Sequence, residues 1–170
     1  FLKMERVREA ETYNMSQTVP GRINSIVNIH NPSIEFHPVD RGLNTGATII
    51  LAAGGGHRTL NVGGESADFV PFFYNYGINT VILRNRLRSD GYEPTTDGVN
   101  DALQAIRMVR AYAKQWNLDP NKIGIMGFSA GGATAGLAVL NGDNRAYVKA
   151  DAADEHSCAP NFAMLIYPAG

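Results

Sequence analysis

Cysteine, charge and long apolar runs are all scarce in this chain of 170 residues, and each scarcity excludes a class of protein. The single cysteine, Cys158, excludes an internal disulfide and a zinc site built from several cysteines. Charged residues make up 18% of the chain and the net charge is −1, so nothing argues for binding to nucleic acid or to an anionic membrane. No apolar run approaches the ~20 residues that a membrane-spanning helix needs.

Short apolar segments alternate with segments of helical periodicity along the chain. Strands are expected at residues 23–29, 33–37, 48–52, 79–84, 122–126 and 162–167. Helices are expected at residues 67–76, 99–116 and 130–140. Thr96 and Asp97 are placed to cap the second helix. This alternation predicts an α/β fold, in which helices cover both faces of a mostly parallel sheet.

The most specific signal is Gly-Phe-Ser-Ala-Gly at residues 127–131, which fits the pattern G-x-S-x-G. An apolar strand precedes it and a helix rich in small residues follows it, so Ser129 stands where a strand turns sharply into a helix. Such a turn strains the backbone of its apex residue and lifts the hydroxyl clear of the sheet. This context predicts that Ser129 is a catalytic nucleophile. The alternative is a loop rich in glycine and serine that performs no chemistry.

Three consecutive glycines, residues 54–56, directly follow a buried strand segment. Acyl transfer passes through an oxyanion, and backbone N–H groups stabilise it best where no side chain blocks their approach. We predict that the N–H groups of Gly55, Gly56 and Ala130 form this oxyanion hole; the alternative is a flexible strand-to-helix turn. His57 is assigned to the substrate pocket, with a solvated turn as its alternative. A nucleotide site is not indicated, because neither G-x-G-x-x-G nor a P-loop lysine is present.

These motifs resemble the carbohydrate-esterase-like branch of the α/β-hydrolases, which includes acetyl xylan esterases and other small-acyl esterases. The likeness lies in residues 48–58, 79–87, 101–125 and 151–154 with 160–168. It implies an α/β-hydrolase fold and a serine esterase acting on short acyl esters of carbohydrate, without a cofactor or a metal. It also favours a secreted or periplasmic location if the substrate is a polysaccharide. Asn85 departs from the family, which carries an aromatic residue there.

The catalytic triad of such hydrolases runs serine, acid, histidine along the chain, each on a loop after a strand. The chain holds four histidines. His30 and His37 are expected at surface positions of the leading strands, and His156 precedes the last strand, too early for the base. We therefore expect residues 1–170 to be the amino-terminal part of a single α/β-hydrolase domain, with acid and base on a carboxyl-terminal segment of the same protein that this chain does not hold.

The remaining polar residues are interpreted as structural. Asp97 is taken as a helix cap, and Asp101 as a carboxylate on the helix surface or one that anchors a loop. The arginines of residues 84–88 are taken as solvated or ion-paired. The acidic residues of 151–155 are taken as solvated, because no EF-hand spacing is present. Cys158 has no cysteine-hydrolase signature around it.

Two other functions remain open at this level. The residues Ser-Ala-Gly-Gly at 129–132 also fit a serine peptidase or lipase on the same scaffold. A non-catalytic binding protein that retains the elbow without a base is the alternative from another class.

Overall fold

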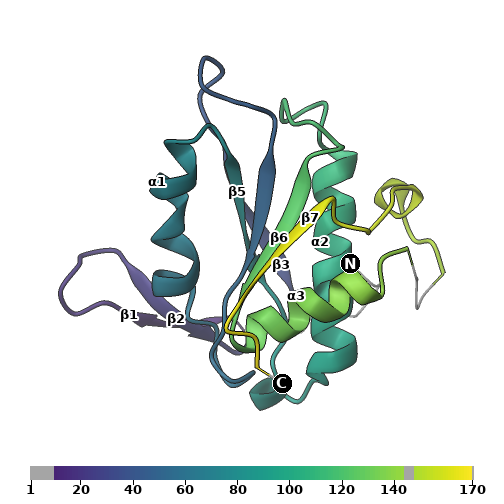
Figure 1. Ribbon diagram of the computed structural model, residues 1–170. Helices are drawn as coiled ribbons and strands as arrows, with labels where there is room; N and C mark the ends of the chain where they lie inside the picture. The colour runs from purple at the N-terminus through teal and green to yellow at the C-terminus, as the bar shows by residue number, and fades with distance from the viewer. Residues whose placement is uncertain (1–9, 144–147, 170) are drawn as a thin grey trace.

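The computed structural model describes residues 10–143 and 148–169, which form one sheet of five strands and another of two (Figure 1). The strands are β1 (Thr12–Met15), β2 (Ile23–Val27), β3 (Ser33–His37), β4 (Thr48–Ala52), β5 (Asn79–Arg84), β6 (Ile123–Phe128) and β7 (Phe162–Ile166). The helices are α1 (Phe69–Tyr74), α2 (Val99–Ala111) and α3 (Ala130–Leu140). Short helical turns lie at Gly63–Ala67, Arg88–Asp90, Pro94–Gly98 and Ala152–Glu155.

The larger sheet has the strand order β3-β5-β4-β6-β7. Neighbouring strands in it are parallel, except that β3 runs antiparallel to β5. In this register Ala52 of β4 pairs with Leu83 of β5 on one side and with Gly127 of β6 on the other. The three central strands therefore end at the same edge, which is the lower end of the sheet in Figure 1. The loops that follow β4 and β6 start beside each other at that edge.

Alternation along the strands divides the core into two layers. Ile50 and Val81 belong to a buried cluster with α2 and α3, whereas Ile49 and Ile82 belong to a cluster with α1 on the opposite face. All five residues of β4 are buried, as expected for a central parallel strand that is covered on both sides. Figure 1 shows α1 on one side of the sheet and the other two helices on the other. The predicted mostly parallel sheet with helices on both faces is confirmed.

The amino-terminal part differs from the sequence prediction. Thr12–Met15 forms β1, a strand that the prediction missed, and all four of its residues are exposed. β1 pairs antiparallel with β2, so β2 and β3 do not pair with each other. The exposure of all four residues explains the omission, because a segment without a buried face need not show the apolar alternation of a strand.

Two helices differ in extent from the prediction. The segment expected to begin at residue 67 starts as a helical turn at Gly63–Ala67 and continues as α1 to Tyr74. α2 ends at Ala111, although apolar spacing extends to Trp116. Trp116 is half-buried by stacking rather than by helical continuation, since its ring centroid lies 4.5 Å from that of Phe36 on β3.

The predicted capping of α2 by Thr96 and Asp97 is wrong. The helical path begins earlier, at the turn Pro94–Gly98, so no side chain caps the backbone at Gly98. Glu93 precedes this turn, and its carboxylate accepts a hydrogen bond from the Thr95 N–H at 3.3 Å. The Asp97 side chain instead accepts a hydrogen bond from a residue before the turn, the Glu93 N–H, which lies 2.9 Å from its Oδ2. Proline at the first position of a helical turn explains why the path begins there.

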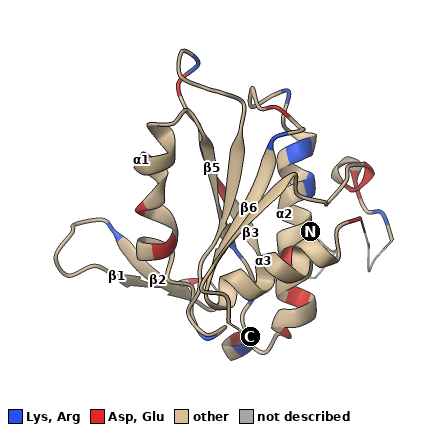
Figure 2. Ribbon diagram, in the orientation of Figure 1, with Lys and Arg blue, Asp and Glu red and all other residues tan. Residues whose placement is uncertain are grey.

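Charged side chains lie mainly on helices and loops, while the central strands are almost free of them (Figure 2). The acidic cluster at residues 151–155 is not wholly solvated, which corrects the prediction: Asp154 is buried and forms a capping box with Asp151. Glu155 pairs with Lys149 at 2.5 Å. Among the described residues, no group of three His, Cys, Asp or Glu is arranged to hold a metal ion. The same residues include no helix that is long and apolar enough to cross a membrane.

Candidate active site

Ser129 stands between the last residue of β6 and the first residue of α3, with φ 51° and ψ −118°. Residues with a side chain rarely adopt this backbone conformation, and the surrounding hydrogen bonds hold it in place. The Ser129 N–H donates to the Ile166 carbonyl at 3.0 Å, and the Ser129 carbonyl accepts the Ala133 N–H at 3.1 Å. The strand–serine–helix turn read from the sequence is present, strain included.

The glycines on either side of the serine are required by close backbone approach. A Cβ on Gly127 would lie 2.1 Å from the Gly131 carbonyl oxygen. A Cβ on Gly131 would lie 2.1 Å from the carbonyl oxygen of Ala52, the last residue of β4. The first turn of α3 therefore rests directly on the end of β4. Any larger residue at either position would push the serine away from the neighbouring loop.

The loop after β4 uses its first glycine for anchoring. The Gly54 N–H donates to Oε2 of Glu65 at 2.6 Å, and the Gly54 carbonyl accepts the Asn61 N–H at 2.9 Å. Gly55 and Gly56 both have positive φ, 132° and 63°. Within the described part of the chain, neither of their N–H groups donates to a protein acceptor. Two adjacent donors are thus left for a ligand, which is the requirement for an oxyanion hole.

This loop and the serine lie against each other. A Cβ on Gly54 would fall 3.0 Å from the Ser129 Cβ and 2.6 Å from the Phe128 carbonyl oxygen. The Ala130 N–H lies at the start of α3, where the first N–H groups of a helix have no partner within the helix. The site therefore joins the nucleophile candidate to the three predicted donors at one edge of the sheet. The oxyanion roles of Gly55, Gly56 and Ala130 stay predictions.

Glu65 is a residue of the site that the sequence reasoning missed. Its carboxylate joins the loop after β4 to the segment after β7, because Oε2 accepts the Gly54 N–H and Oε1 lies 3.3 Å from the Tyr167 hydroxyl that donates to it. Burial raises the pKa of Tyr167, and the Glu65 charge adds to that shift, so this hydroxyl keeps its proton. Glu65 lies eleven positions after Gly54, and no sequence motif links a glutamate at that distance to the glycine whose N–H it accepts.

His57 follows the two donor glycines and is half-buried, with φ 58°. Its carbonyl accepts the N–H groups of Arg88 at 2.9 Å and Ser89 at 3.3 Å, so the next loop holds its backbone in place. Burial lowers the pKa of His57, the Arg88 charge lowers it further, and Glu93 opposes both. The lowered pKa favours the neutral form of the imidazole that follows the predicted oxyanion loop. Its assignment to the substrate pocket stays a prediction.

The other three histidines lie away from the serine. His30 is not at a surface strand position as expected; it precedes β3, and its Nδ1 lies 2.8 Å from the Tyr92 hydroxyl. His37 lies on β3 with its Nε2 2.8 Å from a Glu35 carboxylate oxygen. His156 precedes β7 and is therefore at the amino ends of the parallel strands, opposite Ser129. None of the described histidines hydrogen-bonds Ser129.

Two charged residues next to this edge are buried, and of the two predicted roles of Arg86, solvated or ion-paired, the ion-paired one is confirmed. Arg86 and Asp101 are each 3% exposed and pair with each other, so the helix-surface alternative for Asp101 is wrong and the loop-anchoring one is confirmed. Asn85, where the resembled family carries an aromatic residue, is also buried and donates from Nδ2 to the Arg86 carbonyl at 3.0 Å.

A strained serine at a strand-to-helix elbow, beside a glycine loop on a mostly parallel sheet, defines the α/β-hydrolase fold. The BD-FAE family model matches residues 39–164, and the chain belongs to this family. The acetylxylan esterase of Xylanibacter ruminicola is 32% identical over 124 residues, which cover 73% of this chain and 23% of that protein. The resemblance drawn from the sequence is confirmed.

Solved structures give the same result. The acetyl ester-xyloside bifunctional hydrolase of Caldicellulosiruptor lactoaceticus is 32% identical with a TM-score of 0.73, covering 83% of this chain and 50% of that one. The esterase Est2 of Thermogutta terrifontis with propionate bound is 26% identical with a TM-score of 0.70, covering 84% and 52%. The chain therefore spans about a quarter of the curated relative and about half of each solved chain.

We expect His57 to titrate below its ordinary value of 6.5 in an NMR pH titration, because burial and the Arg88 charge both disfavour the imidazolium. Arg88→Gln should raise the His57 pKa part of the way back. Glu93→Gln, the control of opposite sign, should lower it further. The resonance is assigned by its loss in His57→Gln, and a His57 that titrates at or above 6.5 contradicts the environment described here.

Proposed function

We propose that the protein containing this chain is a serine esterase that cleaves short acyl esters on carbohydrate through an acyl-enzyme on Ser129. The observation that carries the proposal is the placement of Ser129, strained at φ 51°, against a glycine loop with two N–H groups that have no acceptor among the described residues. A nucleophile and an oxyanion hole at one sheet edge are the two parts that acyl transfer needs from this half of the fold.

The reaction has two steps. The Ser129 Oγ attacks the ester carbonyl carbon while a histidine base takes its proton, and the carbonyl oxygen becomes an oxyanion held by the N–H groups of Gly55, Gly56 and Ala130. Collapse of this intermediate releases the alcohol, which takes the proton from the histidine. Water then attacks the acyl carbon by the same route and frees the acid and Ser129. No cofactor or metal takes part in these steps.

The relatives support a short acyl group on carbohydrate. One relative is named an acetylxylan esterase, one solved structure an acetyl ester-xyloside hydrolase, and another holds propionate. These names favour an esterase over the peptidase, lipase or binding-protein alternatives that the elbow sequence leaves open. A secreted or periplasmic location stays a prediction that follows from a polysaccharide substrate.

The acid and base come from a carboxyl-terminal segment of the same protein, which completes a single domain with residues 1–170. Three observations support this part of the proposal. No described histidine reaches Ser129, and the chain spans about half of its solved neighbours. β7 is an edge strand that leaves Phe162 36% and Leu165 45% exposed. Native folds cover or pair an apolar edge of this kind.

We expect Ser129→Ala to abolish esterase activity in the complete protein while leaving it folded, because the variant removes only the Oγ that attacks the ester. The measurements are p-nitrophenyl acetate turnover, labelling by a fluorophosphonate probe, and circular dichroism as the folding control. Retention of more than a few per cent of wild-type turnover, with contamination excluded, would refute the assignment of Ser129.

Gly55→Ala should lower kcat strongly, because its Cβ would lie 2.2 Å from the Thr59 carbonyl oxygen and would displace the loop with its donors. Loss of one such donor typically costs about 100- to 1,000-fold in kcat. Gly56→Ala separates collision from backbone strain: its Cβ meets no atom within 4 Å, so it should lower kcat less than Gly55→Ala, through its positive φ of 63° alone. A change confined to KM in Gly55→Ala would mean that the loop binds substrate rather than the oxyanion.

Residues 1–170 alone should not hydrolyse p-nitrophenyl acetate, whereas the same residues with the segment that follows should do so. The comparison uses both proteins at equal concentration, with circular dichroism to verify the α/β content of each. Turnover by residues 1–170 alone, lost in His57→Gln or His156→Gln, would show that the base lies within this chain.

A further inference from the structure

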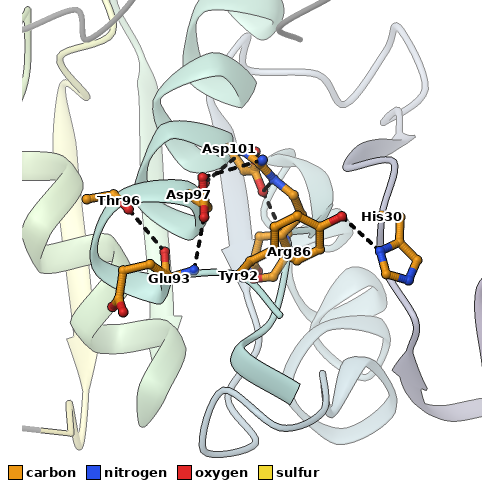
Figure 3. Close-up of polar contacts among 8 residues, drawn as sticks. His30, Arg86, Tyr92, Glu93, Thr96, Asp97 and Asp101 are labelled. Atoms are coloured by element: carbon orange, nitrogen blue, oxygen red, sulfur yellow. Dashed lines mark hydrogen bonds and ion pairs between the residues drawn. The ribbon is translucent and has the colours of Figure 1, made fainter. Parts of the chain in front are cut away.

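A buried ion pair fixes the loop that follows β5. Arg86 donates from Nη2 to Oδ1 of Asp101 at 2.8 Å, and from Nε to Oδ2 of the same carboxylate at 3.0 Å. The Arg86 backbone N–H also donates to Asp101 Oδ2, at 2.9 Å. A single carboxylate on α2 therefore holds both the side chain and the backbone of Arg86, the second residue after β5 (Figure 3). Burial disfavours the charge of Arg86, but Asp101 outweighs it and raises the Arg86 pKa, so the guanidinium stays charged.

The same guanidinium organises the far end of the loop. Its carbon lies 5.2 Å from the ring centroid of Tyr92, and its Nη2 donates to the Asp97 carbonyl at 3.3 Å. The Tyr92 hydroxyl in turn bonds to His30, as Figure 3 shows. Residues 86–92 thus form a closed loop that is tied at both ends to one arginine.

Residues at the tip of the 86–92 loop hydrogen-bond to the backbone of the predicted oxyanion loop. The N–H groups of Arg88 and Ser89 donate to the His57 carbonyl, at 2.9 and 3.3 Å. The Ser89 hydroxyl donates to the Arg58 carbonyl at 2.8 Å. Residues 57 and 58 are the ones that directly follow Gly56, so these bonds fix the end of the loop opposite to the Glu65 anchor on Gly54.

The oxyanion loop needs this external support because it ends in His57, a residue with a side chain at positive φ. Gly55, Gly56 and His57 have three consecutive positive φ angles of 132°, 63° and 58°. Glycine adopts positive φ readily, but His57 carries a side chain, and such a residue keeps this conformation only where its surroundings over-determine it. Within the loop, the Gly55 carbonyl accepts the Arg58 and Thr59 N–H groups at 3.1 and 3.3 Å. The hydrogen bonds from Arg88 and Ser89 to the His57 carbonyl are the support that comes from outside the loop.

We propose that the Arg86–Asp101 pair is a positioning device for the oxyanion hole: it fixes the loop after β5, whose tip sets the backbone of His57 and hence the direction of the Gly55 and Gly56 N–H groups. The inference rests on the proposed esterase function. A buried ion pair seldom adds much net stability, because its desolvation offsets its attraction. Its value in this place is geometric, since the planar fork of arginine fixes direction as well as distance.

The test uses the complete protein with Asp101→Asn and, separately, Arg86→Lys, which keeps the charge but lacks the fork. Glu35→Gln is the matched control, because it breaks the 2.7 Å ion pair between Glu35 on β3 and Arg84, the last residue of β5, without touching the loop. Active serines are counted by end-point titration with paraoxon. Kinetic constants for p-nitrophenyl acetate and the Ki of a phenyl trifluoromethyl ketone are then measured per active serine. This ketone forms a hemiketal with the serine and places its oxygen in the oxyanion hole.

We expect both variants to lose about 10- to 100-fold in kcat per active serine, with a parallel rise in the Ki of the ketone and a KM within about twofold of wild type. The control should keep wild-type values. A merely structural role would lower the number of active serines and the melting temperature but leave kcat and Ki per serine unchanged, and that result would overturn the proposal.

Where a single variant does not fold, the double variant Arg86→Gln with Asp101→Asn replaces it, because the amide pair buries no charge. It should show the same loss, and failure of all three to fold would identify the pair as core support and overturn the proposal. Failure of the esterase function is distinguishable, since the wild-type protein would then neither be titrated by paraoxon nor bind the ketone.

Discussion

Parallel pairing of β4 with β6 is the constraint on which the site depends. Because Ala52 and Gly127 are register partners, both strands end at the same height and their loops leave the sheet side by side. Gly131 then allows the first turn of α3 to rest on the Ala52 carbonyl. The serine between them has little freedom, since the strand before it and the helix after it are both packed against β4. Strain at Ser129 is the consequence of this closure rather than an isolated feature.

A second constraint comes from the loop after β4, which is held at its ends and open in its middle. Glu65 binds the Gly54 N–H, while Arg88 and Ser89 bind the His57 carbonyl. The two N–H groups between these anchors are directed by the anchors together with the loop's own turn, in which the Gly55 carbonyl accepts the Arg58 and Thr59 N–H groups at 3.1 and 3.3 Å. Preorganised dipoles of this kind stabilise developing charge without reorganising during the reaction. The few charged residues buried at this edge contribute to the geometry of the backbone.

Much of this arrangement could be predicted from the sequence. β3, β4 and β5 begin and end where their composition places them, because each is bounded by turn residues. The G-x-S-x-G elbow was equally predictable, because the motif, the strand before it and the helix after it are contiguous in the sequence. Two of the predictions that failed involve partners distant in the chain: β1 depends on pairing with β2, and the burial of Asp101 depends on Arg86, fifteen positions earlier.

The sequence by itself determined the fold class, the nucleophile candidate and the glycine loop, because periodicity, turn residues and short motifs act over a few neighbouring positions. Only the tertiary structure decided which glycine N–H is occupied, by bringing Glu65 onto Gly54. It also decided that His30 faces Tyr92 rather than solvent, and that Arg86 is buried against α2. The physical reason is that the strand register decides which distant residues come within hydrogen-bond or ion-pair distance. The residues next to each partner in the sequence give no signal of that contact.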